Sequence, residues 1–184
     1  TKIRLMTFGN ISFNEILTVT FTLFAVIDMV GNVPVLASLR EKMGGEIRSL
    51  QATLASGALM ILFLLIGQQF LNILGLDVQS FAVAGSIVIF IIGLEMVLGH
   101  EFFKSDGNPK SGSVVPIAFP LIAGSGTLTT VMSLKANYFD INIFIGILIN
   151  CIVIFLVLKS LKCIENVLGP NGMTVIRKIF SVIL

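Results

Sequence analysis

Several residue types that build catalytic or structural sites are scarce in this chain of 184 residues. It has no tryptophan, one tyrosine, one histidine and two cysteines. The single histidine, His100, excludes a metal site built from imidazole ligands. Cys151 and Cys163 lie roughly 18 Å apart along one predicted helix, which is too far for a disulfide bond within it. No nucleophile–base pair or cluster of metal ligands is visible, so we expect neither an enzyme nor a cofactor.

Charged residues are scarce as well. Only 12% of the residues are charged and 55% are hydrophobic, whereas soluble domains carry about 25% charged residues. Long apolar runs between short polar segments therefore predict an integral membrane protein that lies in a lipid bilayer. The lysines and arginines cluster in the loops, and no basic patch with interleaved aromatic residues suggests a nucleic-acid partner. Composition leaves the oligomeric state open.

The apolar runs predict six transmembrane helices in one membrane domain. The loops after the first, third and fifth runs carry nine lysines and arginines, against three on the other side. The positive-inside rule therefore places the polar linker 99–112 in the cytoplasm and both termini on the opposite side. The sixth run would cross only about 16 Å of a ~30 Å hydrocarbon core, so we expect the last helix to be incomplete. The predicted helices are 13–39, 49–74, 80–98, 113–134, 141–161 and 174–184, with a basic loop over 159–178.

The first apolar run is interrupted near its middle. Asp28, Gly31, Asn32 and Pro34 lie within seven positions; Pro34 lacks a backbone donor, and glycine weakens a helix. We therefore predict that the helix breaks between Asp28 and Asn32 and restarts at about Val33. Unpaired backbone groups at membrane depth are tolerated only where they face protein or a water-filled cavity. The break is thus a candidate binding site.

A second interrupted run, over residues 115–127, aligns with the first without a gap when 95 is subtracted from each number. Gly126 then falls on Gly31 and Thr127 falls on Asn32, and threonine and asparagine both favour helix N-caps. We predict a break at the Gly-Ser-Gly sequence and a restart after Thr127. Two interrupted segments at matching positions of two halves indicate a secondary-transporter site.

Each half contains three predicted helices, and an odd number gives the two halves opposite orientations in the membrane. The expected fold class is an all-α integral membrane protein of six helices in two inverted three-helix repeats, each with a broken first helix. The two repeats are residues 13–98 and 113–184.

Polar and small residues recur at helical spacing along the predicted helices. Asn14, Thr18 and Thr22 form a stripe that leads to Asp28. The threonine hydroxyls either bond to carbonyl groups of their own helix or line a cavity. Small residues of the second run, such as Ser56 and Gly57, are expected to permit close helix packing.

Asp28 is the strongest candidate for a functional residue. A charge at the membrane centre costs at least ~2.5–3.5 kcal/mol on insertion scales, so we predict that Asp28 couples transport to a proton or Na⁺; the alternative role is a helix cap. The helix restarts present N–H groups that attract anions, and the second glycine-rich break could form an anion-binding nest.

Asn150, near the middle of the fifth run, either joins helices or contacts a ligand. The predicted substrate-binding residues are Asp28, Gly31, Asn32, Gly124, Ser125, Gly126, Thr127 and Asn150.

These interrupted motifs resemble the MarC family over nearly the whole chain. The similarity implies a six-helix inner-membrane protein, grouped with LysE-type exporters, of which some members transport small neutral amino acids such as glycine and alanine. Met29 and Ser125 stand where the family often has proline. The residues that carry the resemblance are Phe24–Asp28, Gly31–Pro34, Ala84–Gly85, Gly93–Met96, Pro116–Gly124 and Gly126.

Two classes of function follow from the sequence. The first is a secondary transporter of small neutral amino acids, with export as one direction, coupled to H⁺ or Na⁺. The second is an uncoupled channel or a membrane scaffold. A passive pore needs no titratable group at the membrane centre, so Asp28 favours the transporter. A metal-ion carrier has less support, because no imidazole accompanies the acid.

Overall fold

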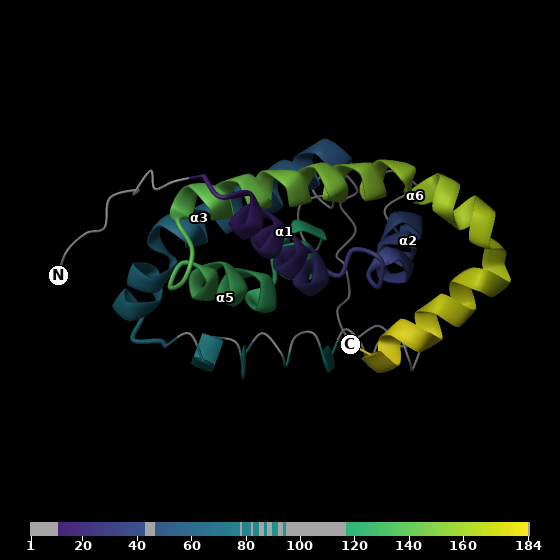
Figure 1. The fold of residues 1–184 in the computed structure, drawn as a ribbon. Coiled ribbons are helices and arrows are strands. Elements are labelled where there is room, and N and C mark those ends of the chain that lie inside the picture. Colours follow the sequence, from purple (N-terminus) through teal and green to yellow (C-terminus); the bar gives the residue numbers. More distant parts are fainter. Residues whose placement is uncertain are drawn as a thin grey trace.

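A computed structural model describes residues 11–42, 47–77, 79–81, 83–84, 87, 90–91, 94 and 117–183. This part of the chain contains helices and turns and no strand (Figure 1). The long elements α3 and α6 carry stretches, Ser49–Ile73 and Asp140–Gly169, that are long and apolar enough to cross a membrane. The elements are α1 (Phe13–Ile27), α2 (Val33–Lys42), α3 (Ser49–Ile73), the π-helical turn η1 (Ile117–Ile122), α5 (Ser125–Leu134) and α6 (Asp140–Ile183).

Helices α6 and α3 together contact every other element: η1 packs against α3, and α5 packs against α3 and α1. Helix α6 is the longest element. It packs against α1, α2 and α3. Figure 1 shows its first half running the length of the bundle, with α5 near its start and α2 near the far end of that half. The core between these helices is aliphatic and is built from fully buried side chains that include Leu23, Met60, Leu64, Leu128, Ile143 and Ile147.

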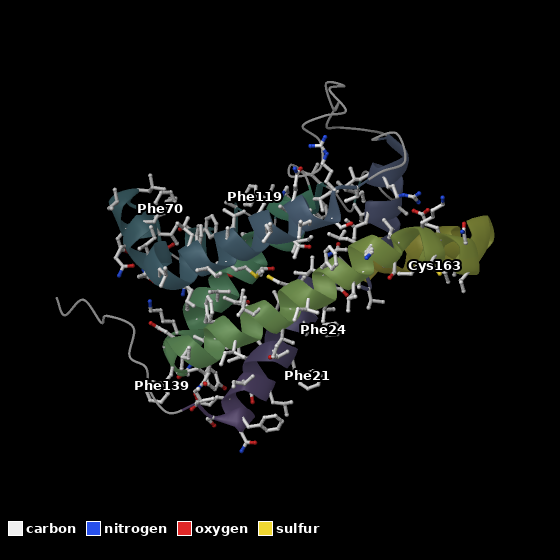
Figure 2. The ribbon with its side chains drawn as sticks, turned by 90° about the horizontal axis from the view of Figure 1, so that it is seen from above. Phe21, Phe24, Phe70, Phe119, Phe139 and Cys163 are labelled. Atoms are coloured by element: carbon white, nitrogen blue, oxygen red, sulfur yellow. The ribbon has the colours of Figure 1, made fainter. Side chains whose placement is uncertain are left out.

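The outer surface of the bundle carries many large apolar side chains. Phe21 and Phe70 are 63% and 45% exposed, and Figure 2 shows both, together with Phe24, at the periphery of the helices. In water such a surface would associate, whereas in a bilayer it faces lipid tails of the same polarity. A helix that is apolar on all sides suits this surrounding, because its backbone groups are satisfied internally.

Small residues bring the helices into close contact. A Cβ atom added to Gly57 of α3 would lie 2.8 Å from Sγ of Cys151, and one added to Gly146 of α6 would lie 2.7 Å from Cγ1 of Val19. The prediction that Gly57 serves packing is therefore confirmed. Gly146 gives α1 the same close approach to α6.

The break in the first predicted helix is found where the sequence placed it, but α2 ends at Lys42, three residues beyond the predicted end at Leu39. Helix α1 ends at Ile27, α2 begins at Val33, and α3 ends at Ile73, one residue before the predicted end. Most of the predicted third helix, all of the linker 99–112 and the predicted start of the fourth helix lie outside the described residues. The six spans and the two repeats as whole units stay predictions.

The predicted end of the fifth helix is wrong. The helix does not stop at Leu161 and give way to a basic loop over 159–178. It continues to Gly169, which has φ 64° and kinks the chain, and helical structure resumes beyond it. Glycine adopts this positive φ without strain, and Pro170 cannot continue the helical stretch that precedes Gly169. Most residues from Lys159 to Leu168 have adequate helix propensity. Glu165, in this interval, forms an ion pair with Arg40 of α2.

The contact at Gly146 yields the first prediction. Gly146→Ala should lower the thermal unfolding temperature in detergent, because the added methyl overpacks against Val19 at a cost of about 1–3 kcal/mol. In the double variant Gly146→Ala/Val19→Ala the smaller side chain at position 19 makes room for the added methyl group. Its loss of stability should therefore be smaller than the sum of the losses of the two single variants. An unchanged unfolding temperature in Gly146→Ala would show that α1 and α6 do not pack here.

Candidate functional site

The first break lies between α1 and α2 and is organised by Asp28. This residue has φ 44° and ψ 53°, the left-handed conformation that aspartate tolerates better than most residues. Its N–H still donates to Phe24 O at 3.1 Å, and its carbonyl accepts from the N–H of Asn32 at 3.0 Å. Its carboxylate oxygen Oδ1 accepts from the N–H of Gly31 at 3.1 Å. Asp28 therefore ends α1 and holds the turn that leads to α2.

The second break lies between η1 and α5. Phe119 is extended inside η1, with φ −136° and ψ 131°, and Pro120 follows it. Gly124 is also extended and precedes α5 as its N-cap residue. A Cβ atom on Gly124 would clash with the carbonyl oxygen of Pro120, so the break requires glycine at this position.

The second restart comes earlier than the sequence predicted. Helix α5 begins at Ser125, so Ser125, Gly126 and Thr127 form its first turn and Thr127 does not precede it. The reason is Gly124: the backbone turns at this glycine, where no side chain obstructs it. The predicted N-cap role of Thr127 is therefore wrong.

A matching hydrogen bond closes each break. The side-chain nitrogen Nδ2 of Asn32 donates to Ile27 O at 2.9 Å, and the hydroxyl of Thr127 donates to Ile122 O at 2.9 Å. Each donor lies five residues after its acceptor, and the two pairs are related by the same offset of 95. Each side chain thus satisfies the last carbonyl group of the preceding helix, where no helical N–H is available. The repeat seen in the sequence is expressed as equivalent hydrogen bonds.

The two breaks border one cavity. Its volume is about 260 Å³. Five of the predicted site residues line it: Asp28 and Asn32 from the first break, and Gly124, Gly126 and Thr127 from the second. The cavity is therefore shared between two segments nearly a hundred residues apart in sequence.

The remaining cavity wall was not predicted as part of the site. It consists of Ala25, Val26, Ile27, Pro120 and Leu121. The offset of 95 pairs Ala25 with Pro120 and Val26 with Leu121, as it pairs Asn32 with Thr127. The repeat alignment therefore contained the signal that could have identified these apolar residues.

Three predicted site residues do not line the cavity. Gly31 and Ser125 are buried next to lining residues. Asn150 lies on α6, where its Nδ2 donates to Gly146 O at 2.9 Å and to Thr20 O of α1 at 3.1 Å. Of its two predicted roles, the structure supports joining helices.

The polar stripe of α1 also takes the structural role. The hydroxyl of Thr18 donates to Asn14 O at 2.9 Å, and that of Thr22 donates to Thr18 O at 2.8 Å. Neither threonine is among the residues that line the cavity. Their hydroxyls are satisfied by their own helix, as is common for threonine in apolar helices.

The two breaks contribute opposite electrostatic features. The first supplies the half-buried carboxylate of Asp28. The second supplies the N-terminus of α5, which no side chain caps within the described residues. The N–H groups of a first helical turn carry partial positive charge and attract anions. The cavity therefore lies between a negative group and a partly positive helix end. Among the described residues there is no group of three or more His, Cys, Asp or Glu that could hold a metal ion.

Membrane-length apolar helices, a lipid-compatible surface and broken helices around an internal cavity define a helical integral membrane protein. The model of the MarC family of integral membrane proteins matches residues 13–184, and the chain belongs to this family. A relative in Bacillus subtilis, the UPF0056 membrane protein YvbG, is 31% identical over 188 aligned residues, which cover 94% of this chain and 89% of the relative.

A second relative has a name that includes its membrane. The UPF0056 inner membrane protein YhgN of Escherichia coli K12 is 26% identical over 178 aligned residues, covering 93% of this chain and 90% of the relative. The names of both relatives describe a membrane location and no enzymatic activity. No solved structure matches the chain significantly.

The paired hydrogen bonds give the second prediction. Thr127 is only 3% exposed, so Thr127→Val removes the hydroxyl, keeps the shape and leaves Ile122 O buried without its partner. This should destabilise the protein by about 1–3 kcal/mol, measured as a lower thermal unfolding temperature in detergent. Thr127→Ser keeps the hydroxyl and should restore most of the loss. Equal unfolding temperatures for the valine and serine variants would contradict the role of this bond.

Proposed function

We propose that the protein is a secondary transporter of small neutral amino acids of the glycine and alanine class, coupled to H⁺ or Na⁺, with export as one direction of transport. The observation that carries this proposal is the single cavity bordered by both helix breaks, with a carboxylate on one side and an uncapped helix N-terminus on the other. Sites of this kind, at discontinuous helices of two repeats, are typical of secondary transporters. In the proposed architecture, six helices form two inverted repeats that rock around this cavity.

The substrate class follows from the charges of the cavity. A zwitterion would place its carboxylate at the N–H groups of Gly126 and Thr127, in the first turn of α5, and its ammonium group at Asp28. Both charged groups would then be paired, which offsets the cost of removing them from water. The sequence allowed the carboxylate at either restart. The first restart is less suited, because Pro34 has no N–H and the carboxylate of Asp28 already accepts from Gly31.

The size of the cavity supports a small substrate. A volume of about 260 Å³ is below the ~300 Å³ at which pockets begin to hold drug-sized ligands. The apolar wall from Ala25, Val26 and Leu121 offers no partner for a charged or strongly polar side chain. Glycine, alanine and residues of similar size fit this description.

Asp28 supports the coupled mechanism over a passive pore. It is the single carboxylate among the lining residues, and the matching position of the other repeat is Ala123. A titratable or cation-binding group at the substrate site lets one ion bias the binding of another ligand. The uncoupled channel or scaffold keeps some support from the bond between the Asp28 carboxylate and Gly31, which is a structural role.

Asp28→Asn separates coupling from structure. Asparagine tolerates the left-handed backbone and keeps an oxygen that accepts from Gly31, but it carries no charge. We expect the rate of gradient-driven transport of labelled glycine and alanine into proteoliposomes to fall roughly tenfold or more, while the unfolding temperature changes little.

Asp28→Ala is the matched control, because it loses the charge and also the bond to Gly31. It should lower the unfolding temperature as well as transport. Gradient-driven transport that persists in Asp28→Asn with unchanged dependence on pH and Na⁺ would support the uncoupled alternative.

Gly126 should set the size of the substrate. A Cβ atom at this position meets only Cγ1 of Val26, at 3.9 Å, so Gly126→Ala fits the fold and takes space from the cavity. One methyl group in an apolar pocket is worth roughly tenfold in binding. We therefore expect alanine affinity to fall more than glycine affinity, measured by calorimetry, with the unfolding temperature retained.

Gly57→Ala is the packing control, because its methyl would press on Cys151 away from the cavity. It should lower the unfolding temperature and leave the glycine-to-alanine preference unchanged. Normal alanine binding by Gly126→Ala would place the substrate elsewhere.

A further inference from the structure

A pair of basic residues at repeat-equivalent positions extends the symmetry of the breaks. Arg40 lies near the end of α2, and Lys135 directly follows α5. The two are related by the offset of 95, and each lies eight residues after the side chain that closes its break, Asn32 or Thr127. The sequence alone does not show which acidic residues pair with them.

Both basic residues pair with acids of α6. Arg40 Nη1 pairs with Glu165 Oε2, and the two side chains are 18% and 23% exposed. Lys135 Nζ lies 3.7 Å from Asp140 Oδ2, with side chains 29% and 12% exposed. Lys135 also donates to Leu64 O of α3 at 2.7 Å, which adds a third helix to this contact.

The two ion pairs lie at opposite ends of one membrane span. Asp140 and Glu165 are 25 residues apart on the helical stretch that precedes the kink at Gly169. This separation corresponds to about 37 Å along a helix, which exceeds the ~30 Å hydrocarbon core. Figure 1 agrees, with α5 near the start of α6 and α2 near the far end of its first half. Helices α2 and α5 thus begin at one cavity and reach opposite ends of α6.

The geometry points to two latches, one at each membrane face, that hold the half-helices in place between transport steps. The Arg40–Glu165 pair holds α2 to α6, and Lys135 holds the end of α5 to Asp140 of α6 and to Leu64 O of α3. The inference rests on the proposed transport function and deepens it. Release of the Arg40–Glu165 pair would free α2 and expose the cavity to one face. Release of the Lys135–Asp140 pair would free α5 and expose the cavity to the other face.

The Arg40–Glu165 pair is suited to reversible release. It is partly exposed, so water can replace the lost partner at low cost. The second carboxylate oxygen of Glu165, Oε1, is buried and has no hydrogen-bond partner within the described residues. The closed state is therefore stabilised less than a fully satisfied buried pair would be.

The test measures access to the cavity from each face and needs no transport. A single cysteine is introduced as Gly126→Cys, with Cys151→Ala and Cys163→Ser removing the native thiols. The protein is reconstituted in one orientation, and a membrane-impermeant maleimide is added from one side at a time. We expect Glu165→Gln to raise the labelling rate roughly fivefold, the scale of a partly exposed ion pair, from the face that carries Arg40 only. Asp140→Asn should raise it by a similar factor from the other face only.

Controls distinguish the latches from general loosening. The charge-swapped pair Arg40→Glu/Glu165→Arg should return labelling towards that of the parent, and Lys162→Gln should leave it unchanged because Lys162 is exposed on α6 outside both pairs. Equal increases from both faces, or no change from either, would overturn the inference. Because labelling is independent of substrate, absence of amino-acid transport by the protein with its native Gly126, together with side-specific labelling of the cysteine variant, would refute the substrate proposal and leave the latches standing.

Discussion

The constraint on which this structure depends is that backbone groups at membrane depth must find hydrogen-bond partners. Two helices end in the interior of the bundle, so their last carbonyl groups lack helical partners. Asn32 and Thr127 solve this in the same way, each donating to a carbonyl oxygen five residues back. An unsatisfied carbonyl in this position would cost about 1–3 kcal/mol. The breaks are therefore built and stable features, and the cavity between them follows from their proximity.

The two breaks share this geometry but differ in the charged groups that they place at the cavity. Asp28 in the first break matches Ala123 in the second, so the cavity has one carboxylate and lacks symmetry of charge. The second break instead leaves the N-terminus of α5 without a side-chain cap. A symmetric cavity with two acids would favour cations, and one with none would favour neutral ligands. An acid facing a helix N-terminus suits a molecule that carries both charges.

Local chemistry made some of the structure predictable. Proline, glycine and a polar cluster specify where α1 ends and α2 begins, so those bounds were predicted to the residue. The start of α5 differs from the prediction by three residues because Gly124 is required by a local backbone contact with Pro120 O, four residues earlier, which residue types alone do not reveal. The end of the fifth helix was missed for a related reason. Charged residues after Leu161 suggested a loop, whereas Glu165 is accommodated by its pair with Arg40. The role of Asn150 was decided by the proximity of Thr20, which spacing along one helix could not reveal.

The packing of α6 bears on the motion proposed for the half-helices. The first half of α6 carries the aliphatic core residues Ile143, Ile147 and Ile154, each at most 1% exposed, and it packs against α1 through Gly146 without space to spare. Moving it would disrupt the core at high cost. Helices α2 and α5 have only ten residues each, and each joins its neighbour through a break with few backbone bonds to lose. Both half-helices also contribute buried core residues, such as Leu36 in α2 and Leu128 in α5, so the proposed motion would repack part of the core. Because the cavity is bordered by both breaks, a pivot at either break would change its shape.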